Sequence, residues 1–328
     1  MTSRLARWLA ALAVTFAAAP ASAQLGADAQ KSYDDFQRLA PHRAFAIAAD
    51  GKGYPWAGAS GADPGSAAAS VLKSCEERSK SKCTLYAVNN IVLNGRDWKS
   101  AAPPLLPAIG RLRPEPYWQN KGPRAAAGLI VWSHGYMSGK DSTSSAPQGE
   151  VANFTREGYD LYRFDREWIH DWPGDATALA EAAKQARAMG YKRVVLAGQS
   201  AGAWVSMAAA ARGAPVDGVI SVAAAHHGYV RNMRDVSIAR SEWRQIVRGI
   251  KPGPRLVVVN FANDDYDVGG RMDDARTAFA ASGIQALVIA EPQGFTGHGA
   301  AGGNTFPRKF GACIHAFIET GARQPPCS

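Results

Sequence analysis

The sequence of 328 residues contains only four cysteines, and none of them belongs to the closely spaced Cys pairs that are typical of structural zinc sites. It contains no glycine-rich phosphate loop of the dinucleotide-binding or P-loop kind. The formal net charge is +9, yet basic residues are scattered and form no run of five or more. These absences give no support for a metal site, a nucleotide cofactor or nucleic-acid binding, and none of the three is expected.

Long hydrophobic runs are also missing, apart from a short one at the N-terminus. Arg4 and Arg7 supply a positive start, residues 8–19 an apolar run, and residues 21–23 a small-residue cleavage site, which together indicate a secretory signal peptide. The run is shorter than the roughly 20 residues needed to span a bilayer, so we expect cleavage rather than anchoring. Removal of residues 1–23 from the 328 leaves 305 residues with no expected transmembrane span. The protein is therefore predicted to be exported, to the periplasm or the extracellular space.

The cysteines all follow this signal, and an even number of cysteines in an exported chain favours disulfides over free thiols. Four cysteines permit three connectivities. Closeness in sequence favours Cys75 with Cys83 and Cys313 with Cys327, while the other two connectivities stay open. The positive net charge makes an anionic envelope surface, such as lipid head groups or a cell-wall polymer, a candidate partner.

Proline divides the chain into two parts. Six prolines fall within residues 101–124, which excludes a long helix there and predicts an extended linker. The linker is expected to separate a small α+β module, residues 24–100, from a larger domain, residues 125–328. In the module the patterns predict two strands, a helix and a third strand, at residues 44–49, 54–59, 64–80 and 83–93.

From residue 125 onward, apolar strand-like runs alternate with helical segments. The expected strands cover residues 128–133, 160–164, 193–197, 218–223, 255–261 and 285–290. The expected helices cover residues 149–157, 176–189, 201–212, 237–249, 273–281 and 307–320. This alternation predicts an α/β fold with an open, doubly wound, mostly parallel sheet, whose catalytic residues would lie at the carboxyl ends of strands.

The sequence Gly198-Gln199-Ser200-Ala201-Gly202 follows the apolar run RVVLA and precedes an alanine-rich helical segment. In a G-x-S-x-G motif between strand and helix, the serine occupies a sharp turn, and Gly198 and Gly202 avoid clashes that side chains would cause. Ser200 is therefore the candidate nucleophile. The N–H group of Ala201, at the helix N-terminus, is a candidate oxyanion donor.

An earlier apolar run, LIVWS, ends in His134-Gly135-Tyr136. Together with the serine motif, this element resembles the α/β-hydrolase family, whose early strand ends in a His-Gly pair that contributes a backbone N–H to the oxyanion hole. The resemblance covers the chain from about residue 125 to the C-terminus. It implies that the Tyr136 N–H is the second oxyanion donor. It also implies a structural role for His134, because in this family the order along the chain is serine, acid, histidine.

The acid is expected after the strand at residues 255–261, where the sequence offers three aspartates in NDDYDVGG. Family members often carry an acid followed three residues later by Val or Pro, which favours Asp265, with Val268. Asp264 remains a close alternative and Asp267 is the weakest of the three. A carboxylate here would accept the Nδ1 proton of the histidine and hold the required tautomer.

The candidate general base is His298, in the glycine-rich segment GFTGHG that follows the last expected strand. Its position completes the order serine, aspartate, histidine. His315 falls in the terminal helix and is expected to pack or lie at the surface. His226 and His227 are adjacent and therefore point in different directions on a strand, which makes a poor metal site. They are expected to line the mouth of the active site or to satisfy local hydrogen bonds.

Aromatic residues near strand ends are candidates for an acyl pocket, although core packing is the default for such residues: Trp132, Trp168, Trp172 and Trp204. Only about 20 residues lie between Tyr229 and Gly249, where many lipases insert a lid. We therefore expect an open site without a bulky cap.

The leading hypothesis is an exported serine esterase that cleaves a small-molecule or lipid-like acyl ester through Ser200, His298 and Asp265 or Asp264. Peptidase or acyltransferase chemistry on the same residues remains an alternative. A second alternative, of a different class, is an envelope-binding protein that uses a hydrolase fold as a scaffold.

Overall fold

The protein is described here from a computed structural model. The structure describes residues 25–57, 63–137, 140–141, 145–166 and 171–327. The expected signal peptide, residues 1–23, and Trp168 lie outside these ranges.

A seven-stranded sheet forms the centre of the larger part of the molecule, with the strand order β13-β12-β11-β10-β6-β9-β5. All neighbouring strands from β13 to β9 run parallel, and only the edge strand β5 is antiparallel. This mostly parallel, doubly wound arrangement confirms the predicted α/β-hydrolase fold. The strands are β5 (Leu112–Pro114), β6 (Leu129–Ser133), β9 (Asp160–Phe164), β10 (Val194–Gln199), β11 (Gly218–Val222), β12 (Arg255–Asn260) and β13 (Ala286–Ala290).

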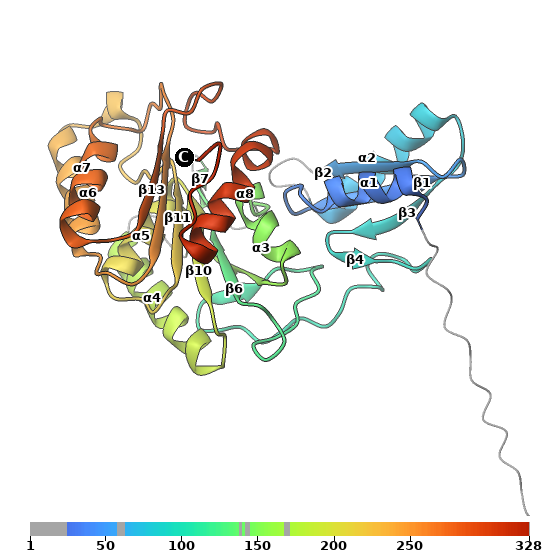
Figure 1. The fold of residues 1–328 in the computed structure, drawn as a ribbon, viewed down its shortest axis with the longest axis horizontal. Helices are drawn as coiled ribbons and strands as arrows, with labels where there is room; N and C mark the ends of the chain where they lie inside the picture. The colour runs from blue at the N-terminus through green and yellow to red at the C-terminus, as the bar shows by residue number, and fades with distance from the viewer. Residues whose placement is uncertain (1–24, 58–62, 138–139, 142–144, 167–170, 328) are drawn as a thin grey trace, which may run out of the picture.

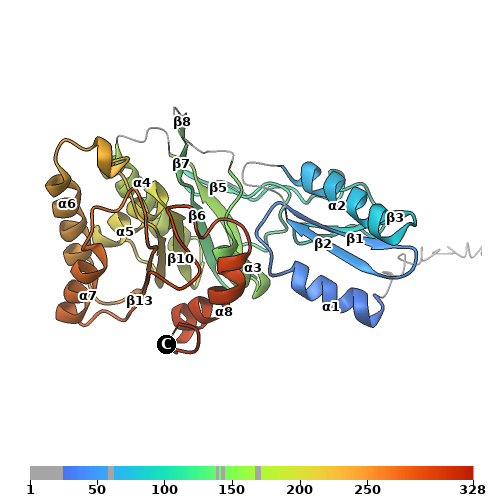
Figure 2. The same ribbon diagram turned by 90° about the horizontal axis from the view of Figure 1, so that it is seen from above.

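Helices cover both faces of this sheet (Figures 1 and 2). Side chains alternate between the faces along each strand, so Leu129 and Val131 enter one buried cluster while Ile130 and Trp132 enter the other. The first cluster is closed by α4 (Trp172–Ala188), α5 (Ala201–Ala211), α6 (Val236–Gly249) and α7 (Arg271–Ser282). The second is closed by the turn η1 (Gly149–Val151), α3 (Ala152–Arg156) and α8 (Thr305–Thr320).

The six predicted strands of this sheet are all present, with ends within two residues of those expected. Five elements were not predicted: α1 (Ala27–Phe36), the edge strand β5, the two strands of a short hairpin, β7 (Tyr136–Met137) and β8 (Lys140–Asp141), and the turn η2 (Val230–Asn232). The predicted single strand at residues 83–93 is wrong. Asn89 has a positive φ of 52°, and the chain turns there between β3 (Cys83–Val88) and β4 (Ile91–Val92).

The N-terminal module has its own antiparallel sheet, in the order β2-β1-β3-β4. It consists of β1 (Arg43–Ala48), β2 (Gly53–Ala57), β3 and β4, with α1 and α2 (Pro64–Ser79) packed against it. In Figures 1 and 2 the module lies on the side of α3 and α8, away from α6 and α7.

The proline-rich segment is more than a linker, because parts of it belong to the larger domain. Leu112 of β5 is fully buried in the cluster under α4, and Trp118 is buried in the cluster under α8. The same segment binds the module: the Glu115 carboxylate lies 2.9 Å from Nε2 of buried His42, and Asn89 Nδ2 donates to the Tyr117 carbonyl at 2.9 Å. Proline has no backbone N–H group, and an edge strand tolerates this because only one of its sides pairs with a neighbouring strand.

Both predicted disulfides are confirmed. Cys75 on α2 pairs with Cys83 on β3, and Cys313 on α8 pairs with Cys327 near the C-terminus.

Among the described residues, no helix is long and apolar enough to cross a membrane.

Glu150, in the turn η1, is a buried carboxyl group with unusual surroundings. Its exposed fraction is 1%, and neither carboxyl oxygen has a hydrogen-bond partner in another described residue. Burial disfavours the charged form and raises the pKa of Glu150 to about 7, and a hydrogen bond to its own backbone offsets only part of this effect. The group is therefore protonated in the folded protein at mildly acidic pH.

The disulfide at the end of α8 should contribute measurably to stability. Its cysteines are separated by 14 residues, and closing a loop of that size is worth about 3 kcal/mol through the unfolded state. We expect the double substitution Cys313→Ala and Cys327→Ala to lower Tm by roughly 6–12 °C, measured by calorimetry. Reductant should lower the Tm of the wild type by more than that of the variant, which keeps only the Cys75–Cys83 disulfide. Equal melting of both proteins would show that this link contributes nothing.

Glu150 should make stability depend on pH. In the folded protein its pKa lies above the ordinary value of 4.5. The contribution of the protonated group to folding stability is therefore fully present below pH 4.5, and it is lost as the pH rises through about 7. Glu150→Gln keeps a neutral group of the same shape, so its Tm advantage over the wild type should grow between pH 5 and pH 8. Glu157→Gln, at an exposed position of the same segment, is the control and should show no such trend. A pH-independent difference for Glu150→Gln would contradict this assignment.

Candidate active site

Ser200 lies at the turn between β10 and α5, at the carboxyl edge of the sheet. Its backbone has φ 55° and ψ −121°, a strained conformation for a residue with a side chain. The turn is held because the Ser200 N–H donates to the Val222 carbonyl at 3.0 Å, while its own carbonyl accepts from the Trp204 N–H at 3.0 Å. This bend presents the hydroxyl beyond the sheet, as the G-x-S-x-G motif predicts.

The two motif glycines are required by backbone contacts. A Cβ atom on Gly202 would lie 2.0 Å from the Ser133 carbonyl oxygen, and one on Gly198 would lie 2.5 Å from the Gly202 carbonyl carbon. Neither neighbour is the end of a flexible side chain. The close approach of α5 to the end of β6 therefore depends on Gly202, and its close approach to β10 depends on Gly198.

His298 connects the serine to an acid. Its Nε2 lies 2.8 Å from Ser200 Oγ, and its Nδ1 lies 2.9 Å and 3.0 Å from the two carboxylate oxygens of Asp264. The Asp264 side chain is 1% exposed and the His298 side chain 18% exposed. An imidazole in this position can accept the serine proton at Nε2 while the buried carboxylate holds Nδ1–H.

The acid that contacts His298 is Asp264, so the preference for Asp265 at this position is corrected. Asp264 follows Asn263, whose φ of 56° turns the chain sharply after β12, and the carboxylate also accepts from the Tyr266 N–H at 2.9 Å. The exposed Asp265 contributes only its backbone carbonyl, which accepts from the Val230 N–H at 2.9 Å. The pattern of an acid three residues before valine selected the wrong aspartate. The chain turns at Asn263, and the carboxylate that reaches His298 is that of the next residue, Asp264.

Asp267 has a structural role. Its carboxylate accepts a hydrogen bond from Asn260 Nδ2 and lies 3.4 Å from Nε of Arg271. Arg271 is 1% exposed and also donates to the carbonyls of Tyr266, at 3.1 Å, and Ala224. This buried guanidinium therefore ties the acid-bearing loop to the end of β11. Sequence reasoning missed Arg271, since an arginine at a helix start gives no sign of burial.

The loop that carries His298 is fastened to the loop that carries Asp264. The Gly297 N–H donates to the Ala262 carbonyl at 2.7 Å, and the Thr296 hydroxyl donates to the same carbonyl at 3.0 Å. From the other side, Gln199 Nε2 donates to the His298 carbonyl at 3.4 Å. These contacts fix the histidine between the serine turn and the acid.

The His-Gly turn after β6 is held by a buried arginine. Arg166, 2% exposed, donates to the His134 carbonyl at 2.6 Å and to the Gly135 carbonyl at 3.1 Å. A Cβ atom on Gly135 would lie 2.4 Å from the side-chain oxygen of Gln199. Tyr136, the next residue, lines the pocket at Ser200, whereas the His134 ring is 1% exposed beneath the turn.

A pocket of about 420 Å³ opens at Ser200 and His298. Its walls also include six residues from strand ends and the surrounding loops: Tyr136, Gln199, Ala225, His226, Tyr229 and Tyr266. The Tyr266 ring lies on the His298 ring, with centroids 4.1 Å apart, and burial raises the pKa of the Tyr266 hydroxyl to about 12. The hydroxyl is therefore neutral at physiological pH.

The paired histidines separate as expected. His226 lines the pocket, while His227 lies 3.1 Å from Glu242 of α6, and burial lowers the pKa of the His227 imidazole. His315 packs edge-on against Phe154. Among the tryptophans, Trp132 and Trp204 are core residues, and Trp172 packs on Trp204 and on His226.

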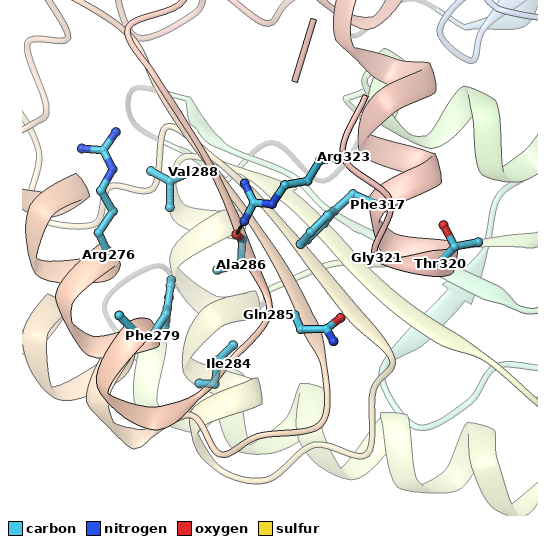
Figure 3. A pocket seen from close by; sticks show the side chains of 11 residues that line it. Arg276, Phe279, Ile284, Gln285, Ala286, Val288, Phe317, Thr320, Gly321 and Arg323 are labelled. Atoms are coloured by element: carbon cyan, nitrogen blue, oxygen red, sulfur yellow. Dashed lines mark hydrogen bonds between the residues drawn. The ribbon is translucent and has the colours of Figure 1, made fainter. Parts of the chain in front are cut away.

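A second hollow, shown in Figure 3, lies beside the edge strand β13 between α7 and the end of α8. Arg323 reaches across it and donates to the Ala286 carbonyl at 2.5 Å. Its lining contains no histidine or carboxylate that could act as a general base, and its one hydroxyl group, on Thr320, donates to the Ala316 carbonyl at 2.8 Å. The chemistry of the described residues therefore favours the pocket at Ser200.

No protein-family model and no curated protein matches the chain. Among solved structures it is similar to a truncated carbohydrate esterase from gut microbiota, with 14% identity, a TM-score of 0.48, and coverage of 63% of this chain and 88% of that one. It is also similar to dipeptidyl peptidase 4 of Porphyromonas gingivalis, with 14% identity, a TM-score of 0.46, and coverage of 63% and 33%. It is similar as well to an acylaminoacyl peptidase of Pyrococcus horikoshii, with 13% identity, a TM-score of 0.44, and coverage of 62% of this chain and 39% of that one. The chain thus spans about a third of each peptidase, and likeness at this level carries no function to it.

Gly202 offers a direct test of the serine turn. A methyl group at Gly202 would meet backbone atoms of Ser133 at 2.0 Å and 2.4 Å, so Gly202→Ala should destabilise the protein by at least the ~1–3 kcal/mol typical of overpacking. Urea titration would measure this loss. Gly299→Ala is the matched control, because a Cβ atom there meets nothing within 4 Å. Equal stability of the two variants would mean that the contact between β6 and α5 is looser than described.

Proposed function

We propose that the protein is an exported serine hydrolase that cleaves acyl esters, with Ser200 as nucleophile, His298 as general base and Asp264 as the orienting acid. The observation that carries the proposal is the continuous hydrogen-bonded chain from Ser200 Oγ through His298 to the buried Asp264 carboxylate. Its two distances, 2.8 Å and 2.9 Å, leave no rearrangement to be made before proton transfer.

In the proposed reaction, Ser200 Oγ attacks the ester carbonyl carbon while its proton moves to His298 Nε2. The carbonyl π electrons move onto oxygen and form a tetrahedral oxyanion. When the C–O bond to the alcohol breaks, His298 returns the proton to the leaving alkoxide. Water then repeats the sequence on the acyl-enzyme, and the products are a carboxylic acid, an alcohol and free Ser200.

The oxyanion would be bound by the backbone N–H groups of Ala201 and Tyr136. Ala201 is the first residue of α5, where N–H groups lack partners within the helix and the helix dipole favours negative charge. Tyr136 follows the glycine turn that Arg166 holds from below, so its backbone is positioned before substrate binds.

Export is supported by two disulfides, which persist in oxidising compartments, together with the signal-like N-terminal sequence. The proposed substrate is an acyl ester of small-molecule size. A pocket of about 420 Å³ accepts such a molecule, and Ser200 lines this pocket.

A fluorophosphonate probe tests the nucleophile. It should label the folded wild type at one site, identified as Ser200 by peptide mass spectrometry, because only an activated serine reacts quickly with it. Ser200→Ala should remain unlabelled while keeping the same circular dichroism spectrum. An unlabelled wild type, or equal labelling of the variant, would refute the proposal.

The choice between the two aspartates predicts a large difference in rate. Asp264→Asn should lower kcat for p-nitrophenyl acetate by about 10³–10⁴-fold, because the amide favours the wrong imidazole tautomer. Asp265→Asn should change kcat by less than about threefold, as expected for an exposed position. The reverse order of effects would assign the acid to Asp265.

A further inference from the structure

Five of the ten residues that line the pocket at Ser200 carry an aromatic ring. Aromatic rings with polar edges, those of Tyr136, Tyr229 and Tyr266, surround the serine together with the imidazole of His226. None of the lining residues carries an aliphatic side chain longer than that of alanine. A pocket for an alkyl chain would be lined by leucine, isoleucine, valine or phenylalanine, because burial of hydrocarbon needs apolar contact on all sides.

The rings form a continuous stack that ends on the histidine. Tyr229 lies on Tyr266 with centroids 4.3 Å apart, and Tyr266 lies on His298 with centroids 4.1 Å apart, at interplanar angles of 32° and 31°. On another wall, His226 stacks on the buried Trp204, with centroids 6.2 Å apart and an angle of 28°. These contacts hold the rings in place, and aromatic side chains can receive a further planar ring in an offset or edge-to-face arrangement.

Two of these tyrosines keep a large exposed fraction at the mouth of the pocket. Tyr136 is 42% and Tyr229 is 38% exposed, and both border the pocket rather than the core. The exposed part of each ring would gain hydrophobic burial when a ligand covers it. The guanidinium of Arg231 lies 4.9 Å from the centroid of the Tyr229 ring, which helps to hold this ring at the mouth.

We propose that the substrate carries an aromatic ring, bound against the pocket residues Tyr136, Tyr229 and His226 while its ester group lies at Ser200. This inference rests on the proposed function, since it names the substrate class of the same site. Ring stacking is worth about 0.5–1.5 kcal/mol beyond burial. Tyr229 then acts as a specificity residue, which touches the substrate ring and takes no part in proton transfer.

Two pairs of esters with equal carbon number test the proposal. Methyl 3-phenylpropanoate is compared with methyl nonanoate for a ring on the acyl side, and 2-phenylethyl acetate with octyl acetate for a ring on the alcohol side. In at least one pair the wild type should have a kcat/KM about 2–12-fold higher for the aromatic ester, as the stacking energy implies. Tyr229→Leu should reduce this ratio to near one, whereas Tyr229→Phe, which keeps the ring, should preserve it.

Each other outcome has a defined meaning. Equal or higher kcat/KM for the aliphatic ester in both pairs overturns the aromatic assignment. A peracetylated monosaccharide that is cleaved faster than every aromatic ester also overturns it and identifies a sugar site. Fluorophosphonate labelling at Ser200 without cleavage of either aromatic ester rejects this substrate class but leaves the hydrolase proposal standing. Failure of labelling rejects both.

Discussion

The arrangement of the site depends on one contact, the approach of the first turn of α5 to the end of β6. Gly202 meets the Ser133 carbonyl where no side chain would fit, and this proximity forces the bend at Ser200 into a strained backbone conformation. The strain is maintained because β6, β10 and β11 are paired on both sides and buried on both faces. A serine in a looser turn would have no fixed direction toward the histidine.

Much of the fold could be predicted from the sequence because parallel strands buried on both faces are continuous apolar runs. The runs around Ile130, Leu196 and Val257 stand out for that reason, and the helices between them have clear ends. β5 could not be found in this way. Its register comes from pairing with β9, and a three-residue segment that ends at Pro114 has no strand pattern of its own.

The sequence motifs identified Ser200 and His298, but they did not identify which side chains contact these two residues. Ser200 and His298 are marked by flanking glycines, and the structure brings their side chains to 2.8 Å. The choice of Asp264 over Asp265 depends on which residue takes the positive φ, at Asn263, and a sequence rich in aspartate does not specify it. Tyr266 was overlooked because its contact with His298 joins two loops that are distant in the chain.

The small module is not isolated from this chemistry. The Ala40 N–H donates to the Asn304 side chain at 2.8 Å, and Asn304 closes the same glycine-rich loop that carries His298. At its other end the loop is held by the Ala262 carbonyl. A loop with several glycines has high conformational entropy, and fixation at both ends reduces the number of positions that the imidazole can take. Contact with the module thus adds a restraint on the loop of His298 to those made by Ala262 and Gln199, which gives a physical reason for the two parts to pack together instead of moving independently.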